Sequence, residues 1–357
     1  MPISAVDTIE PAFQHAKRQL LQPFRFGQWT RLALVGMLAG ELGSGGGCNG
    51  SFNLPSSTHR QGGTEQFLSL GWPKLLGDHP LMFACLIGFL VLVGLGLIVL
   101  FTYIGSVMRF ILFDSIVAKE CHIRKGWARR GREGHLLFVW QMILMLLSFL
   151  VFVVLIGIPA AFAWGLGWFA HPAEHVVGLV VGGILLFLVF LAVILGFAVV
   201  HLMTKDFVVP QMALEQISAF EGWRRLWLWL KAEKGGYAGY IGMKIVLSVG
   251  AGIALTIISF IVLLALLIPI GGIGAMIWMS AKAAGATWNA STITLAVTAG
   301  CIVLTILVFA ISMISVPAAV FFPAYSIYFL AARYPALADL VWPRQPGTIT
   351  HDETGLT

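Results

Sequence analysis

Runs of apolar residues that are too long for the interior of a soluble domain dominate this sequence. Residues 81–107 and 176–203 form two of them, and each exceeds the roughly 20 residues that a helix needs to cross the hydrocarbon core of a bilayer. The chain is 59% hydrophobic and 11% charged, whereas a soluble domain carries about 25% charged residues. The sequence therefore predicts an integral membrane protein without a large soluble domain.

The apolar runs divide into six expected membrane spans. These cover residues 29–42, 81–107, 136–158, 176–203, 245–268 and 291–314. Pro159 and Pro269 are expected to break the helices of the third and fifth spans, because a proline removes a helical hydrogen bond. Pro317 and Pro323 are expected to separate the sixth span from a short final helix. The predicted fold is an all-α integral membrane protein with six transmembrane helices, arranged as three tandem helical hairpins with cytoplasmic amphipathic helices.

The distribution of Lys and Arg sets the expected orientation. Of the 22 Lys and Arg residues, only Arg60, Lys74 and Lys282 fall in the expected outer segments. Such a bias marks the opposite, Lys- and Arg-rich side as cytoplasmic. We therefore expect the cell (inner) membrane, with both termini in the cytoplasm. The same bias accounts for the net charge of +6 without a nucleic acid as partner.

Two cytoplasmic segments are expected to form amphipathic helices. Near the N-terminus, Phe13, Ala16 and Leu20 share one helical face. Such a helix either lies in the membrane interface or packs on the protein's own cytoplasmic segments. In the second segment, Ser218 and Glu221 have the spacing of a capping box, which begins a helix.

A tryptophan followed two residues later by an arginine recurs at near-constant spacing. The copies are Phe26-Gly27-Gln28-Trp29-Thr30-Arg31, Gly126-Trp127-Ala128-Arg129 and Phe220-Glu221-Gly222-Trp223-Arg224-Arg225. Recurrence of this kind indicates tandem repeats, with approximate bounds of 8–114, 115–210 and 211–325. The repeats form a single membrane domain, residues 1–342, which is followed by a disordered cytoplasmic tail, residues 343–357.

The repeated motif is interpreted as a membrane-interface anchor. Tryptophan prefers the headgroup level, and arginine presents several donors to lipid phosphates. The glycine is expected to act as the hinge at which each cytoplasmic helix turns into the membrane. The expected structural anchors are Trp29, Arg31, Trp127, Arg129, Trp223 and Arg225.

Three segments resemble a broad group of bacterial polytopic membrane proteins. They are residues 23–29, the glycine-rich stretch 43–47 with Ser51-Phe52-Asn53-Leu54-Pro55, and residues 220–225. This group is similar to the membrane domain attached to some glycerophosphodiester phosphodiesterases. The resemblance covers most of the chain and implies a fold. It does not imply the phosphodiesterase activity, because the soluble barrel that carries this activity is missing from the sequence.

Glu41 is the expected functional residue if it lies in the membrane, where a carboxylate is costly and marks a site by default. The alternative is a solvated position in the outer interface, beside the glycine-rich stretch, and we favour that alternative. His201 and Lys244 lie near the cytoplasmic ends of spans, where snorkelling of their side chains accounts for them.

No pattern in the sequence assembles a catalytic or metal site. His171-Pro172-Ala173-Glu174-His175 matches the spacing of a zinc peptidase motif, but it falls in a short outer loop rather than on a helix. We therefore expect no catalytic residues, no metal and no cofactor. The expected function is that of a non-enzymatic multi-pass membrane protein that binds membrane lipids or a partner membrane protein. The alternative is a transporter or channel for a small or lipid-like solute, which should have a polar cavity between its hairpins.

Overall fold

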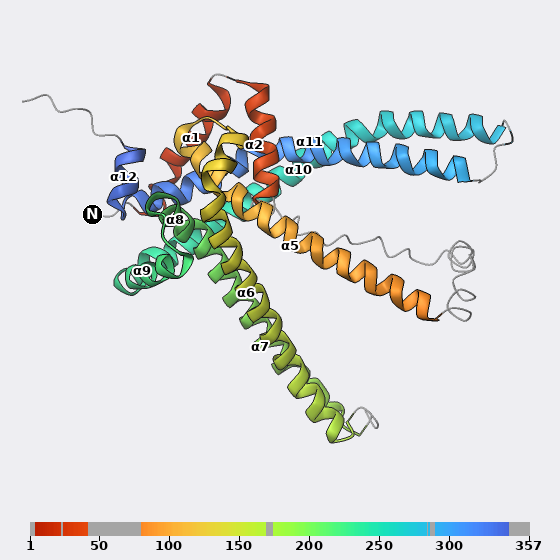
Figure 1. Ribbon diagram of the computed structural model, residues 1–357, viewed down its shortest axis with the longest axis horizontal. Helices are drawn as coiled ribbons and strands as arrows, with labels where there is room; N and C mark the ends of the chain where they lie inside the picture. The colour runs from red at the N-terminus through yellow and green to blue at the C-terminus, as the bar shows by residue number, and fades with distance from the viewer. Residues whose placement is uncertain are drawn as a thin grey trace, which may run out of the picture.

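The computed structural model describes residues 4–22, 24–41, 80–168, 174–283, 285 and 290–342. Regular structure within these ranges is helical throughout (Figure 1), so the all-α expectation is confirmed there. The elements are α1 (Ile9–Leu21), α2 (Phe26–Leu38), α5 (Pro80–Ala118), α6 (Ile123–Gly165), α7 (Val176–Met203), the π-helix η1 (Thr204–Val208), α8 (Val209–Glu215), α9 (Ala219–Ala232), α10 (Lys234–Ala283), α11 (Ala290–Ala331) and α12 (Pro335–Val341). The expected glycine-rich stretch 43–47 and the tail 343–357 lie outside the described residues.

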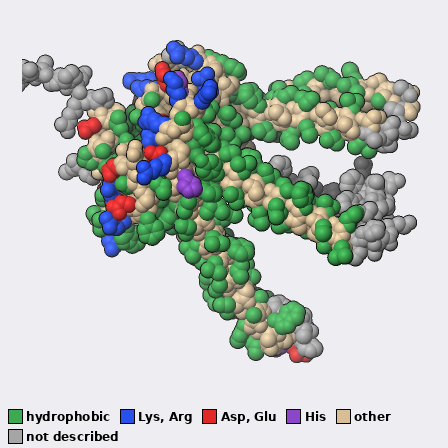
Figure 2. Space-filling model, in the orientation of Figure 1, with side chains coloured by type: hydrophobic (Ala, Val, Ile, Leu, Met, Phe, Trp, Pro, Cys, Tyr) green, Lys and Arg blue, Asp and Glu red, His purple; other side chains and the backbone are tan. Residues whose placement is uncertain are grey.

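Within the described ranges, five helices are long and apolar enough to cross a membrane. They are α5, α6, α7 with its continuation to Glu215, α10 and α11, and they contain the second to sixth expected spans. In Figure 1 they leave a common base as separate arms, formed by α5, by α6 with α7, and by α10 with α11. We call the remaining helices and the adjoining ends of the arms the base. The arms present mainly hydrophobic side chains, whereas the charged side chains gather over the base (Figure 2).

The first expected span differs from the others. α2 has 13 residues, and at about 1.5 Å per residue it is about 20 Å long, which is less than the roughly 30 Å of a bilayer's hydrocarbon core. It packs against α5 and α11. The described residues therefore do not confirm six spans or three complete hairpins.

The expected breaks at prolines are wrong. α6 continues through Pro159, α10 through Pro269, and α11 through both Pro317 and Pro323. A proline removes one backbone bond, and a long apolar helix tolerates that loss where neighbouring groups satisfy the freed carbonyl. The helix of α7 likewise continues through η1 into α8, in a region where the sequence predicts a cytoplasmic loop.

Glycines in the base bring helices close together rather than turn them. Gly126 lies inside α6 and Gly222 inside α9, so the expected hinges at these positions are wrong. A Cβ atom at Gly126 would lie 2.9 Å from Ile111 Cγ1, and a Cβ atom at Gly222 would lie 2.8 Å from Val208 Cγ1. The absence of a side chain therefore allows each helix to approach its neighbour, as small residues do in membrane helix packing.

The two amphipathic helices both pack on the protein. Ala12, Ala16 and Leu20 of α1 are buried, and α1 packs against α11, which agrees with the second of its two expected placements. Contact of α1 with the membrane interface stays a prediction. At the start of α9, the Ser218 hydroxyl accepts a hydrogen bond from the Glu221 amide (3.3 Å), as the capping spacing predicts.

An aromatic core lies where α10 and α11 enter the base. Phe207 of η1, Tyr237 and Tyr240 of α10, and Tyr325 and Phe329 of α11 are all buried. The ring centroids of Tyr240 and Phe329 are 4.6 Å apart, and Tyr240 stacks on Tyr325 at 5.3 Å. Because buried aromatic rings dominate core energetics, this packing holds η1 against α10 and α11.

Ion pairs join helices of the base. Arg130 donates to both oxygens of Asp114 (2.8 and 2.7 Å), which connects α6 to α5. Arg333 donates to both oxygens of Glu233 (2.8 and 2.7 Å), which connects the end of α11 to the start of α10. These hydrogen bonds from Arg333 favour the charged carboxylate and lower the pKa of Glu233 below its ordinary value.

Candidate functional site

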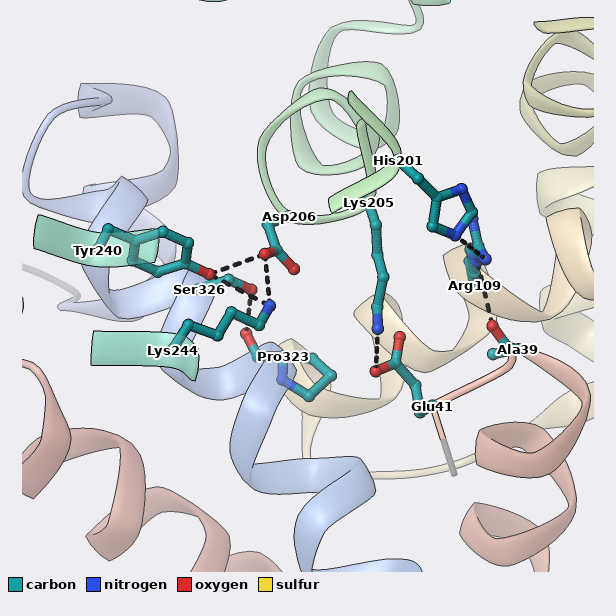
Figure 3. Close-up of polar contacts among 10 residues, drawn as sticks. All are labelled: Ala39, Glu41, Arg109, His201, Lys205, Asp206, Tyr240, Lys244, Pro323 and Ser326. Atoms are coloured by element: carbon teal, nitrogen blue, oxygen red, sulfur yellow. Dashed lines mark hydrogen bonds and ion pairs between the residues drawn. The ribbon is translucent and has the colours of Figure 1, made fainter. Parts of the chain in front are cut away.

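A group of charged and polar side chains lies where the end of α2, α5, α7 with η1, and α10 meet at the base (Figure 3). We call it the charged cluster, and its members are Glu41, Arg109, His201, Lys205, Asp206, Tyr240 and Lys244. Ionisable side chains among membrane helices are costly, and they mark a functional site by default. The cluster is therefore the first candidate for a site in this protein.

The end of α2 carries Glu41 into the charged cluster. Gly40 has a φ of 78°, a left-handed conformation that glycine adopts without steric cost. The Gly40 amide donates to the Met37 carbonyl (3.1 Å). The Glu41 amide donates to the Gly36 carbonyl (2.9 Å). This pair of bonds is the Schellman ending of a helix, so the local sequence ends α2 at this point and turns the chain toward η1.

The π-helix η1 directs two neighbouring side chains to different helices. Lys205 Nζ lies 2.5 Å from Glu41 Oε2, beyond the end of α2. Asp206 Oδ2 accepts a hydrogen bond from the Tyr240 hydroxyl (2.9 Å) and forms an ion pair with Lys244, both on α10. Single π-turns within longer helices are frequent at functional sites. Here the π-turn allows η1 to form one ion pair with Glu41 at the end of α2 and a second ion pair with Lys244 of α10.

Both ion pairs are withdrawn from solvent. The exposed fraction is 3% for Glu41, 2% for Asp206 and 3% for Lys244. The favoured, solvated position of Glu41 is therefore wrong, because the turn at Gly40 directs the carboxylate to Lys205 inside the base. Snorkelling of Lys244 is also wrong, since its ammonium group pairs with Asp206 in the interior.

Arg109 is a cation of the cluster that forms no ion pair with a carboxylate in the described part of the chain. Its Nε donates to the Ala39 carbonyl (3.1 Å), and its Nη2 lies 3.2 Å from His201 Nε2. A guanidinium group can only donate, so His201 Nε2 accepts and the imidazole is neutral, with its proton on Nδ1. Among the described residues no ion pair includes Arg109, and its buried Nη1 has no hydrogen-bond partner there.

The charges of the cluster do not cancel. Lys205 and Lys244 are each matched by a carboxylate, whereas Arg109 adds a further positive charge. A charge among membrane helices that lacks a counter-charge is unfavourable. The charged cluster can therefore stabilise an added anion beside Arg109.

A cleft of about 530 Å³ opens beside Arg109 and His201. Its walls come from the end of α2 and from α5, α6 and α7, and they combine Phe101, Leu144, Met145 and Phe197 with the polar residues Thr102, Gln141 and Ser148. The volume lies within the range of about 300–1,000 Å³ that is typical of ligand sites. One cationic end and mainly apolar walls suit an amphiphile with an anionic group.

The six expected anchors lie outside the charged cluster. Trp29 Nε1 donates to the Leu20 carbonyl (3.0 Å), which joins α2 to α1. Trp223 Nε1 donates to the Thr204 hydroxyl (3.0 Å), which joins α9 to η1. Arg31 Nη1 donates to the Cys121 carbonyl, and the ring of Trp127 packs against Tyr103. Arg129 approaches Asp114, and Arg225 forms an ion pair with Glu215. Their contact with lipid headgroups stays a prediction.

Most members of the charged cluster have no assigned role in the sequence-based expectations. Arg109, Lys205 and Asp206 follow apolar runs, where charges ordinarily mark the cytoplasmic end of a span. One signal for the cluster is present in the sequence: Lys205 and Asp206 are adjacent and carry opposite charges. Neighbouring residues on a helix point in different directions, so this pair indicates contacts with two different helices. In the described part of the chain, no three His, Cys, Asp or Glu side chains are close enough together to hold a metal ion.

The chain belongs to a family of unknown function (DUF7544), whose model matches residues 3–340. This match does not link the chain to the membrane domains attached to glycerophosphodiester phosphodiesterases. No curated protein and no solved structure matches the chain.

Proposed function

We propose that this member of the DUF7544 family is a non-enzymatic multi-pass membrane protein that binds an anionic membrane lipid in the cleft beside Arg109. The observation that carries the proposal is the guanidinium of Arg109 at one end of a cleft with mainly apolar walls: its Nη1 atom is buried without a hydrogen-bond partner, and no ion pair among the described residues includes it. A lipid phosphate supplies the missing negative charge, and hydrogen bonds between charged groups are about twice as strong as neutral ones. The acyl chains then cover the apolar walls.

The surroundings of the cleft favour a lipid over a partner protein as the ligand. The arms present apolar side chains along their lengths, so hydrocarbon surrounds the helices that form the cleft. Basic side chains gather on the base (Figure 2), and such a bias supports our proposal that the base and both termini lie on the cytoplasmic side of the cell membrane. The cleft then opens toward the inner leaflet, where anionic headgroups are available.

The test compares phosphatidylglycerol with phosphatidylcholine as ligands of the purified full chain, by native mass spectrometry in detergent. Wild-type protein should bind phosphatidylglycerol more tightly. Arg109→Gln should weaken this binding about tenfold, because one charge-assisted interaction contributes on the order of 1.5 kcal/mol. Binding of phosphatidylcholine should change little.

Arg129→Gln is the matched control, since the Arg129 side chain is 70% exposed and lies outside the cleft. Its lipid preference should equal that of the wild type. Equal binding of the two lipids by wild-type protein, or an unchanged preference in Arg109→Gln, would contradict the proposal.

Transport of a lipid-like solute is the second candidate function. The observation that favours it is the partly polar cleft between arms of the protein, which a transporter requires and which a fully apolar bundle would lack. Proteoliposomes with a fluorescent phosphatidylglycerol in one leaflet test it. If the protein moves the fluorescent lipid between leaflets and Arg109→Gln slows this movement, the function is transport. If the protein binds the lipid without moving it, the function is lipid binding.

A further inference from the structure

A second hollow, lined almost entirely by apolar residues, lies on another side of the base. It has a volume of about 570 Å³ and is bounded by α1, α10 and α11, with Trp29 of α2 at its edge. We call it the α1 groove. It shares no lining residue with the cleft beside Arg109, so the two are separate sites.

Small side chains on two helices create the α1 groove. Ala251 and Ala254 of α10 face the same space as Pro317 and Ala318 of α11. A larger side chain at these positions would occupy the volume. Across the groove, α1 contributes Phe13, which is 56% exposed although the opposite face of this helix is packed on α11. The groove therefore offers hydrocarbon contacts that no described side chain of the protein uses.

Among the described residues that line the α1 groove, Lys17 is the charged one. Its side chain is exposed, and in the described part of the chain no ion pair or hydrogen bond involves it. Arg18 follows it on α1 and is also exposed. A long apolar side chain of a ligand with an anionic group at one end matches this arrangement, because the lysine stem can lie along apolar surface while its ammonium group meets the anion.

We propose that the α1 groove binds one acyl chain of an anionic phospholipid whose phosphate pairs with Lys17. The hydrocarbon chain lies between α1 and α10 over Ala254, Pro317 and Phe321. The headgroup lies at the level of Trp29, a residue type that prefers the membrane interface. The bound lipid fills the space between α1 and the arm of α10 and α11, and so it stabilises the contact of the N-terminal helix with that arm.

The test uses phosphatidylglycerol with a photoactivatable diazirine in one acyl chain, and the full-length protein in nanodiscs. After illumination, mass spectrometry of peptides locates the adducts. Adducts should concentrate on the α1 segment around Phe13 and on residues 251–255 of α10. The corresponding phosphatidylcholine probe should label these segments less.

Two variants separate the chain contact from the headgroup contact. Ala254→Trp fills the groove and should lower adducts on α1 about tenfold with both probes, which corresponds to about 1.4 kcal/mol of binding free energy. Lys17→Gln should remove the preference for phosphatidylglycerol and leave labelling by phosphatidylcholine unchanged. Lys17 is exposed, so this variant tests the proposal even if Ala254→Trp fails to fold.

Ala265→Trp is the matched control, because Ala265 is exposed on the same helix but does not line the groove. It should leave the α1 adducts unchanged, as should Arg109→Gln, whose site is separate. Unchanged α1 labelling in Ala254→Trp would overturn the proposal. A mass shift to a dimer that Ala254→Trp abolishes would also overturn it, since a second copy of the chain would then occupy the groove.

Discussion

Asp206 and Lys244 form an ion pair in which the two side chains are 2% and 4% exposed. The Tyr240 hydroxyl donates a further hydrogen bond to the same carboxylate oxygen of Asp206. Removal of one partner from such a pair leaves a buried charge alone, which is far more destabilising than the loss of both charges together. At the scale of single residues, this pair therefore holds η1 to α10 only while both charges are present.

Single and double substitutions of this pair test that statement. Asp206→Asn should lower the free energy of unfolding by about 3–5 kcal/mol, and Lys244→Met by a similar amount, because each leaves one buried charge without its partner. The double variant should recover a large part of the loss. Thermal unfolding in detergent measures these differences.

The exposed pair of Arg224 and Glu221, 3.0 Å apart, provides the control for the pair substitutions. Arg224→Gln should change stability by less than about 1 kcal/mol, since solvent screens exposed pairs. If the double variant loses as much free energy of unfolding as the two single variants lose together, the interaction of Asp206 with Lys244 is refuted.

At the scale of elements, the arms are joined to the base by close contacts of helices. α5 and α6 approach each other closely at Gly134, where a Cβ atom would lie 2.5 Å from Val107 Cγ2 and 3.0 Å from Val107 Cα. The backbone atom cannot rotate away as a flexible side chain could. A similar approach of α2 to α5 occurs at Gly105, where a Cβ atom would lie 2.9 Å from the Leu38 carbonyl oxygen, beside the cleft.

Alanine substitutions in α6 distinguish close packing from helix propensity. Gly134→Ala should lower the free energy of unfolding by about 1–3 kcal/mol, because the added methyl group overpacks the contact with Val107. Gly131→Ala, on the same helix and with no atom within 4 Å of the added Cβ, should raise it by about 0.5–1 kcal/mol, since alanine favours the helix. If Gly134→Ala and Gly131→Ala change thermal stability equally, then contact with α5 does not restrict the size of the side chain at position 134.

At the scale of the whole molecule, charge and hydrophobic surface are separated. The long apolar helices extend away from the base, and the base carries the clustered charges (Figures 1 and 2). Lys and Arg on the cytoplasmic side determine the orientation of membrane proteins. The base is therefore expected inside the cell and the ends of the arms outside.

Cysteine labelling in intact cells tests this orientation. In a variant without the four native cysteines, Glu174→Cys at the connection of α6 with α7 should react with a membrane-impermeant maleimide. Arg132→Cys on the base should react only after the cells are permeabilised. The reverse pattern would place the base outside and refute the expected orientation.

Much of the fold could be predicted from the sequence because its signals are local. A long apolar run predicts a long helix regardless of which other helices pack against it. The segments of α5, α6, α7, α10 and α11 can therefore be predicted from the amino-acid sequence alone. The capping residue Ser218 acts on an amide three residues away, and this signal is also local. The continuity of α6 through Pro159 could not be predicted, because neighbouring turns decide whether a proline ends a helix.

The helical class and the long apolar helices follow from the amino-acid sequence alone, as does the gathering of charged residues at one end of these helices. The pairing of Glu41 with Lys205 and of Asp206 with Lys244 depends instead on how distant helices pack together. A charge at the end of an apolar run has the same local pattern whether it reaches toward water or pairs with another helix. The packing of α2, η1 and α10 separates these cases, because it removes water from the charges and brings together side chains that are distant in the chain.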